Sequence, residues 1–312
     1  MSQPHIPVML EKSLDLLNVR AGLVWVDATA GAGGHLLPMA ARAGKSSAVI
    51  GIDRDIHALQ ALKSAAGSAV NLVHANYSNI DSALAGLGID TVTGGILADL
   101  GVSSMQLDDA SRGFSFMSDG PLDMRMDPTQ TTTAADLVNT LPEKELADII
   151  FRYGEERLSR RIARKIVAAR PLNTTAQLAN LVSSCLPSPS KKPGPWRDTS
   201  HPATRTFQAL RIAVNQELES LEKFLRSSLA LMAPGARLVV ITFHSLEDRL
   251  VKQIFREAAS TCICPPRQPL CTCKKRRELL IITPKPLIPD ASEVLANPRS
   301  RSAKLRAGEK VV

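Results

Sequence analysis

A glycine-rich turn near the N-terminus separates two apolar runs, and each run ends in an acidic residue. The first run covers residues 23–27 and leads into the turn Ala28-Thr29-Ala30-Gly31-Ala32-Gly33-Gly34-His35, and the second covers residues 48–53. Glycines let the backbone approach a ligand closely and leave amide groups exposed at the start of the following helix. The order strand, glycine turn, helix, strand and acid therefore predicts an open α/β sheet that binds a nucleoside-bearing cofactor.

Strands and helices alternate along the first hundred residues at the spacing of a parallel, doubly wound sheet. We expect strands at residues 23–27, 48–53, 70–74 and 94–99, and helices at residues 9–18, 34–43, 56–66 and 80–87. Residues 100–130 contain no convincing strand, but they are too rich in leucine, methionine and phenylalanine for a disordered linker. We interpret them as an ordered active-site loop.

A helical block follows this loop, and the α/β pattern then returns. Helices are expected from residue 142 and at residues 155–169, 175–186 and 203–232, followed by a strand at 237–243, a helix to about 258 and late strands at 279–283 and 302–306. The simplest interpretation is one α/β domain, residues 1–124 and 216–312, that is interrupted by an all-helical insertion, residues 125–215.

The acids at the strand ends distinguish between nucleoside cofactors. A dinucleotide site usually has G-x-G-x-x-G, whereas this turn has Gly31, Gly33 and Gly34 and no glycine at position 36. Acids that close the first two strands, Asp27 and Asp53, suit the ammonium group and the ribose of S-adenosyl-L-methionine. Asp99, at the end of the fourth strand, would then lie at the reaction centre.

The charge distribution points to a polyanionic partner. The net charge is +8, and basic residues concentrate at residues 152–170, 274–277 and 299–310. Several such clusters favour nucleic acid over a merely solvated surface. No apolar run approaches the roughly 18 residues of a membrane span, and the N-terminus lacks the features of a signal peptide, so we expect a cytoplasmic protein without a membrane partner.

Several long strings extend the pattern over nearly the whole chain. They are His5-Ile6-Pro7-Val8-Met9-Leu10-Glu11, Asp27-Ala28-Thr29 with Gly33-Gly34-His35, Ile52-Asp53-Arg54-Asp55, Asp99-Leu100-Gly101-Val102-Ser103-Ser104 with Asp123-Met124-Arg125-Met126-Asp127, Tyr153-Gly154-Glu155-Glu156-Arg157, the segments 201–211 and 243–249, and the segment 297–306. With these strings the chain resembles the bacterial 16S ribosomal RNA (cytosine-N4)-methyltransferases, which modify the decoding centre of the small ribosomal subunit.

This resemblance implies a Rossmann-like class I methyltransferase sheet with an inserted all-helical substrate-recognition domain. It implies S-adenosyl-L-methionine as the cofactor and 16S rRNA in the small ribosomal subunit as the partner, and it leaves the oligomeric state open, with a homodimer as one alternative. The cofactor contacts that it implies are Gly33, Gly34, His35, Asp53, Tyr77, Asp99 and Gln106. A tyrosine after the third strand suits stacking against adenine.

The expected chemistry assigns Asp99 as the catalytic residue. Cytosine N4 is a poor nucleophile because its lone pair is delocalised into the ring. The enzyme must align an in-line displacement and accept the N–H hydrogen bonds of N4, which Asp99 or the backbone carbonyls of residues 100–103 could do. The target base has to leave its stack. Phosphate contacts are expected from Arg125, Arg205, Arg211 and the helix at residues 152–170.

Four cysteines form a CxC–x6–CxC array: Cys262, Cys264, Cys271 and Cys273. Disulfides are not expected in a cytoplasmic protein. The alternatives are a zinc site, for which CxxC spacing is more usual, and reduced thiols in a basic loop with no metal.

Three other functions compete with the methyltransferase hypothesis. A nicotinamide-dependent oxidoreductase could use the same fold, although it would give the segment 99–127 no clear role. A non-catalytic RNA-binding or ribosome-assembly factor would not need Asp99. A DNA amino-methyltransferase would usually have Pro-Pro after the acid, where this chain has Leu100-Gly101.

Overall fold

The computed structural model describes residues 6–67, 70–185, 201–264, 270 and 272–312. The chain divides into two compact units. The sheet unit combines Met1–Gly101 with Leu218–Val312, and the helical unit is Val102–Glu217.

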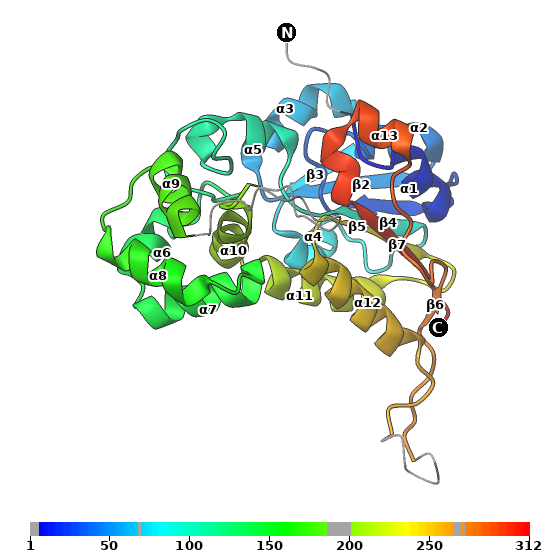
Figure 1. The fold of residues 1–312 in the computed structure, drawn as a ribbon. Coiled ribbons are helices and arrows are strands. Elements are labelled where there is room, and N and C mark those ends of the chain that lie inside the picture. Colours follow the sequence, from blue (N-terminus) through cyan, green and yellow to red (C-terminus); the bar gives the residue numbers. More distant parts are fainter. Residues whose placement is uncertain (1–5, 68–69, 186–200, 265–269, 271) are drawn as a thin grey trace. The chain divides into compact units, whose positions relative to one another are not determined.

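A seven-stranded sheet with the order β3-β2-β1-β4-β5-β7-β6 forms the centre of the sheet unit (Figure 1). Its strands are β1 Val24–Asp27, β2 Ala48–Asp53, β3 Val70–His74, β4 Gly95–Asp99, β5 Arg237–Thr242, β6 Leu279–Ile281 and β7 Lys304–Lys310. The five strands from β3 to β5 pair in parallel, which confirms the expected Rossmann-like α/β class. The late strands, for which the sequence predicted no direction, differ: β7 pairs antiparallel with β5 and β6, an arrangement that needs no crossover helix.

Helices cover both faces of this sheet because successive strand residues point to opposite sides. On one face Val26, Ile96 and Val240 belong to a core that includes α4 Ile80–Ala85, α11 Glu217–Leu231 and α12 Ser245–Ala259. On the other face Trp25 and Val239 belong to a core with α1 Leu10–Leu17, α2 Leu36–Ala43 and α3 Ile56–Ala66. Two smaller elements, α13 Ala291–Ala296 and η4 Pro298–Ser302, lie between β6 and β7 in the chain. No helix in these described ranges combines the length and apolarity needed to cross a bilayer.

The helical unit has a core of its own. Its elements are α5 Ser104–Asp108, η3 Ala110–Arg112, α6 Ala134–Thr140, α7 Glu143–Gly154, α8 Ser159–Ala168, α9 Thr175–Cys185 and α10 Thr204–Asn215. Phe114 and Leu122 are buried among the side chains of these helices, so the loop residues 102–124 belong to this unit and not to the sheet unit. A substrate-recognition role for the expected insertion at residues 125–215 stays a prediction.

The single helix expected over residues 203–232 is interrupted at Gln216. This residue has a left-handed backbone, with φ 48°, and ends α10 one residue before α11 begins. A left-handed residue stops the helical hydrogen-bond series. Because the residue is not glycine, the sequence contained no obvious signal for the break.

Candidate cofactor site at the carboxyl edge of the sheet

Three carboxylates end three neighbouring parallel strands. Asp27 is the last residue of β1, Asp53 of β2 and Asp99 of β4. Since β1 lies between β2 and β4 and pairs in parallel with both, the three acids reach the same edge of the sheet. Open α/β sheets bind their ligands at this edge.

Thr29 connects two of these strand ends. The backbone N–H of Asp99 donates to Oγ1 of Thr29 at 2.7 Å. The Thr29 hydroxyl donates to Oδ1 of Asp27 at 3.4 Å. The backbone N–H of Thr29 donates to the same oxygen at 3.0 Å. The hydroxyl thus accepts from β4 and donates toward β1. Thr29 was not among the site residues expected from the sequence, although an acid that accepts the backbone N–H two residues later is a common turn pattern.

Asp53 holds the glycine turn in place. Its Oδ2 accepts the backbone N–H of Gly31 at 2.7 Å, and its Oδ1 accepts that of Asp55 at 2.8 Å. Gly33 has φ +88°, and a Cβ added there would lie 2.5 Å from Cδ1 of Leu62. Carboxylate oxygens can each accept a second hydrogen bond, so the expected ribose contact of Asp53 remains compatible with these bonds and stays a prediction.

Burial raises the pKa values of all three acids. Asp27 is fully buried, and its pKa is raised to about 7, chiefly by loss of hydration and further by the charge of Asp53. The pKa of Asp99 is raised well above its usual range by burial and by the charges of Asp27 and Glu247. The pKa of Asp53 is raised by burial as well. This edge therefore favours a bound cation, which would stabilise the ionised carboxylates.

Two carboxylate oxygens at this edge are buried without a hydrogen-bond partner. They are Oδ2 of Asp27 and Oδ1 of Asp99, and the statement holds within the described part of the chain. Buried polar atoms are nearly always paired, so such an atom calls for an explanation. A positively charged, hydrogen-bonding ligand at this edge would supply the missing partners.

His35 is the N-cap residue of α2 and lies beside Asp99. Nε2 of its ring is 3.0 Å from the carbonyl oxygen of Val8, and Nδ1 is 3.7 Å from Oδ2 of Asp99. The ring is buried, and Gly34 precedes it in the same turn. The structure thus brings together His35 and Asp99, two of the expected site residues, while their cofactor contacts and that of Gly34 stay predictions.

Tyr77 lies in the short helix η2 Tyr77–Asn79 after β3. The ring of Phe224 packs edge-on against it with centroids 5.3 Å apart, and Cζ of Arg54 lies 5.5 Å from its centroid. The residue is only 7% exposed. Stacking of adenine on this ring stays a prediction, and the guanidinium of Arg54 would have to share or leave the ring face.

In the helical unit, Gln106 has a clear local role. Its Oε1 accepts the backbone N–H of Ser103 at 3.1 Å, and Oγ of Ser103 accepts the backbone N–H of Gln106 at 3.2 Å. These reciprocal bonds form a capping box that starts α5. Gln106 is buried, and its expected cofactor contact stays a prediction.

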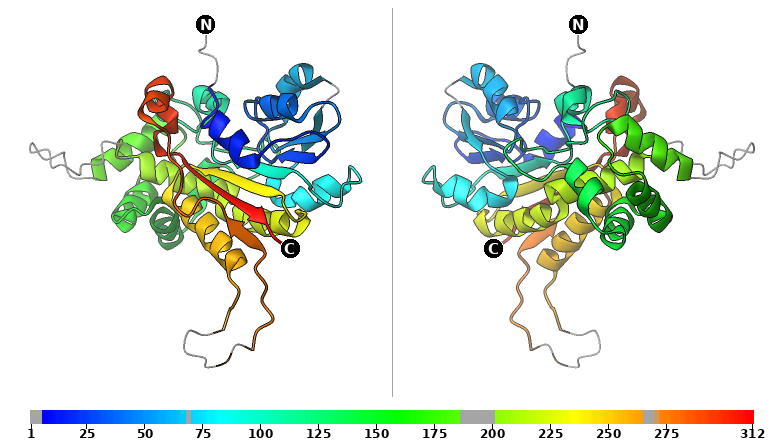
Figure 2. Two further views of the ribbon diagram at one scale, coloured as in Figure 1. Left: turned by 90° about the vertical axis from the view of Figure 1, so that its right-hand side faces the viewer. Right: turned by 90° about the vertical axis from the view of Figure 1, so that its left-hand side faces the viewer.

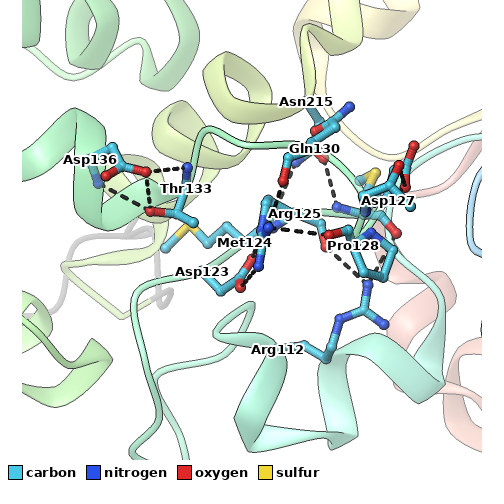
Figure 3. Close-up of polar contacts among 12 residues, drawn as sticks. Arg112, Asp123, Met124, Arg125, Asp127, Pro128, Gln130, Thr133, Asp136 and Asn215 are labelled. Atoms are coloured by element: carbon cyan, nitrogen blue, oxygen red, sulfur yellow. Dashed lines mark hydrogen bonds and ion pairs between the residues drawn. The ribbon is translucent and has the colours of Figure 1, made fainter.

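Arg125 is held by its own loop (Figure 3). Its Nε and Nη2 bind the carboxylate of Asp123 at 2.8 and 2.6 Å, and its Nη1 donates to the carbonyl oxygens of Pro128 and Gln130 at 3.2 and 2.6 Å. Arg112 donates in turn to the carbonyl oxygens of residues 125 and 126. The guanidinium therefore stabilises the loop, and the expected phosphate contact of Arg125 stays a prediction that these bonds disfavour.

The other two expected phosphate contacts differ in their surroundings. Nε and Nη2 of Arg211 form a two-pronged ion pair with Glu217, with both distances 2.8 Å and both side chains largely buried. Arg205 is exposed, and its Nη1 lies 3.4 Å from the carbonyl oxygen of Glu155. Of the two, Arg205 is the more accessible to an RNA phosphate.

The cysteine array lies in the segment between α12 and β6. The sulfur atoms of Cys262, Cys264 and Cys273 all lie within 4.8 Å of one another. Cys271 lies outside the described residues. The structure therefore brings together three of the four candidate metal ligands of the sequence analysis.

Comparisons with known proteins agree with one another. Residues 2–311 match the MraW methylase family. The chain is 50% identical to the Ribosomal RNA small subunit methyltransferase H of Pelobacter propionicus, with 98% of each chain covered, and 49% identical to the protein of the same name from Geobacter sulfurreducens, with 100% of each covered.

Among solved structures, an rRNA methylase from Streptococcus thermophilus overlaps with a TM-score of 0.42 at 10% identity, with 99% of each chain covered. Because this score is low, the fold assignment rests on the strand order of the sheet.

Proposed function

The chain belongs to the MraW methylase family, and we propose that it transfers a methyl group from S-adenosyl-L-methionine to N4 of a cytosine in the 16S rRNA of the small ribosomal subunit. Membership of a methylase family supports the methyl transfer. The shared name of the relatives supports rRNA of the small subunit as the substrate. The resemblance noted in the sequence supports cytosine N4 at the decoding centre as the target.

The buried acids at the carboxyl edge of the sheet are the observation that carries this proposal. Asp27, Asp53 and Asp99 all have raised pKa values, and two of their oxygens lack partners in the described chain. S-adenosyl-L-methionine has two positive groups and one negative group, so it would relieve this deficit of positive charge. A nicotinamide dinucleotide has an anionic pyrophosphate, which these carboxylates would repel. The site therefore favours the sulfonium cofactor.

Each acid has a distinct role in the proposed mechanism. When bound, S-adenosyl-L-methionine supplies an electrophilic methyl group. Asp27 would hold the ammonium group of this cofactor, and Asp53 would hold its ribose hydroxyls. Asp99 accepts an N–H hydrogen bond from cytosine N4, and this bond directs the lone pair of the nitrogen out of the ring plane. The same carboxylate then takes up the proton that the product must lose. Nδ1 of His35 lies 3.7 Å from Oδ2 of Asp99, so it would receive this proton only after the two groups move closer.

A basic face in the helical unit supports a polyanionic substrate. Helix α8 buries Ile162 and Ile166 and exposes Arg160, Arg161 and Arg164. Arginines on an exposed helix face bind phosphates without reading sequence. Recognition of the particular cytosine would then come from an irregular RNA element whose base can be turned out of its stack.

Methyl transfer tests this proposal directly. Purified protein would be given labelled S-adenosyl-L-methionine with small ribosomal subunits, free 16S rRNA or DNA, and the product would be mapped by mass spectrometry. We expect label on N4 of an rRNA cytosine, and an Asp99→Asn variant that is at least about 100-fold slower. Asp81→Asn, at an exposed position of α4, serves as the control.

Several results would contradict the proposal. Label found only in DNA would overturn the substrate. Tight binding of a nicotinamide dinucleotide without binding of S-adenosyl-L-methionine would overturn the cofactor. RNA binding without any methyl transfer by the wild-type protein would indicate a non-catalytic assembly factor.

A further inference from the structure

Two described stretches between α12 and β6, residues 260–264 and 272–278, lead away from the sheet unit side by side, and we call them, with Leu270, the cysteine arm (Figures 1 and 2). At its base the backbone N–H of Glu278 donates to the carbonyl oxygen of Ala258 at 2.8 Å. Ile263 and Leu270, two of its apolar side chains, are 70% and 78% exposed. An arm that buries so little apolar surface needs another source of order, such as a crosslink or a metal ion.

The sulfur atoms of the arm have the spacing of metal ligands. Sγ of Cys262 and Sγ of Cys273, on the two limbs of the arm, are 3.7 Å apart, and Sγ of Cys264 lies within 4.8 Å of both. Zinc–sulfur bonds of about 2.3 Å in a tetrahedron place neighbouring sulfurs about 3.8 Å apart. A disulfide would need about 2.05 Å. The thiol of Cys273 donates a weak hydrogen bond to Sγ of Cys262 across this 3.7 Å, and the pair has the sulfur spacing that a shared zinc ion requires.

Backbone amides point at each of these three sulfurs. The N–H of Cys264 donates to Sγ of Cys262 at 3.3 Å, and that of Ile263 donates to Sγ of Cys273 at 3.4 Å. Sγ of Cys264 accepts from the backbone of Thr272 and Cys273. Amide donors stabilise thiolates, which are the form of cysteine that binds zinc, and they orient the ligands as outer-shell contacts do in metal sites.

The basic run that follows the cluster compensates its charge. A zinc ion bound by three or four thiolates has a net negative charge. Lys274, Arg276 and Arg277 are exposed directly after Cys273. Their positive charges lower the electrostatic cost of collecting several thiolates at one point.

We propose that Cys262, Cys264 and Cys273 bind one zinc ion that fastens the two limbs of the cysteine arm together. Each thiol that coordinates the metal releases one proton to the solvent. Zinc takes a fourth ligand in addition to these three. Cys271 lies outside the described residues, and the proposal rests on the other three cysteines. It is independent of the proposed methyl transfer.

The metal content of the full-length protein tests this proposal. Protein purified under reducing conditions would be dialysed against metal-depleted buffer, and its zinc measured by mass spectrometry of the elements. We expect one equivalent in the wild type, and a loss of zinc affinity of at least about 100-fold in Cys262→Ser and Cys273→Ser. Cys185→Ala is the matched control, because that cysteine is buried in α9 of the helical unit and should leave the zinc unchanged.

Two further measurements make the test independent of folding defects. Cobalt added to the metal-free wild type should give intense sulfur-to-metal charge-transfer absorption, and the two serine variants should not show it. Removal of zinc by a chelator should speed tryptic cleavage after residues 274–277 while the remainder of the chain stays intact. Reduced wild-type protein without stoichiometric zinc would overturn the proposal. So would undiminished zinc in Cys262→Ser, or a Cys262–Cys273 disulfide in protein alkylated on isolation.

Discussion

Nδ1 of His35 lies 3.7 Å from Oδ2 of Asp99, while Nε2 of the same ring lies 3.0 Å from the carbonyl oxygen of Val8. A carbonyl oxygen only accepts hydrogen bonds, so Nε2 has the proton in every charge state of the ring. At 3.7 Å Nδ1 is beyond hydrogen-bond length from Asp99, so the two groups have to move closer before a proton can pass between them. Because burial raises the pKa of Asp99, its carboxyl group can hold a proton at this edge of the sheet until a cation binds.

The pKa of Asp27 predicts an unusual pH dependence of stability. It rises from the ordinary 3.8 to about 7 in the folded chain. Between these values the folded protein holds a proton that the unfolded chain has released, so the free energy of unfolding falls as the pH rises. The shift corresponds to at most about 4 kcal/mol, present below pH 4 and lost above pH 7.

Thermal unfolding of the ligand-free protein between pH 5 and 8 would measure this effect. Asp27→Asn cannot titrate, so its melting temperature relative to wild type should improve steadily as the pH rises through this window. The melting temperature of Asp81→Asn, a change at an exposed position, should vary with pH in the same way as that of wild type. Parallel curves for Asp27→Asn and wild type would show that Asp27 is ionised in the folded protein throughout.

The same acids predict that cofactor binding releases protons. A cationic ligand favours the ionised carboxylates, so the affinity for S-adenosyl-L-methionine should rise by up to about tenfold per pH unit for each proton released below the raised pKa values. Calorimetry in two buffers of different ionisation enthalpy would count these protons near pH 6. Asp27→Asn should release about one proton fewer. Equal proton counts for the two proteins would mean that the ligand leaves Asp27 unaffected.

The sequence contained the local features of this site but not the long-range ones. A glycine turn between two apolar runs and an acid at each strand end can be read directly, because strand length and turn chemistry are local properties. The bond from Asp99 to Thr29 links residues 70 positions apart and depends on the pairing of β1 with β4. The left-handed break at Gln216 has no glycine or proline to announce it.

The contacts of the charged side chains were the feature hardest to predict from the sequence. A basic residue near an expected substrate loop suggests a phosphate contact, but the chain also contains the acids that can neutralise it. Asp123 is two residues from Arg125, and Glu217 is six residues from Arg211. Only the folded backbone determines whether such neighbours meet, and in both cases they do. The net charge of +8 therefore indicates a polyanionic partner without identifying its contacts.

Two glycines allow the glycine turn to be tested with a matched control. Gly33 and Gly44 both have positive φ, +88° and +70°, but an added Cβ meets Cδ1 of Leu62 at 2.5 Å from Gly33 and nothing within 4 Å from Gly44. Gly44 has ψ 176°, a conformation that side-chain residues rarely adopt, so Gly44→Ala should cost the backbone strain alone, about 1–3 kcal/mol, and leave cofactor affinity unchanged. Gly33→Ala should cost more and weaken binding of S-adenosyl-L-methionine. Equal losses of stability and affinity in both variants would contradict a special role for the turn.

Arg125 and Arg160 separate structural from RNA-binding arginines. Arg125→Ala breaks the bonds to Asp123 and two carbonyl oxygens, so we expect a loss of about 2–4 kcal/mol in stability. Arg160→Ala, on the exposed face of α8, should leave the melting temperature unchanged. It should instead weaken RNA binding and lower the slope of log affinity against log salt by about one. If Arg125→Ala instead melts like wild type and lowers the slope of log affinity against log salt, then Arg125 does contact an RNA phosphate.

The ion pair between Arg211 and Glu217 allows a double-mutant cycle. Both side chains are largely buried, with 16% and 5% exposed, so removal of one partner leaves an uncompensated charge in a poorly hydrated position. Arg211→Met and Glu217→Gln should each lower the free energy of unfolding by about 3–5 kcal/mol, and the double variant should lose much less than their sum. Denaturant unfolding of the four proteins would measure this coupling. If Arg211 contacts RNA instead, Arg211→Met should unfold like wild type, show no coupling to Glu217→Gln, and bind rRNA with reduced affinity.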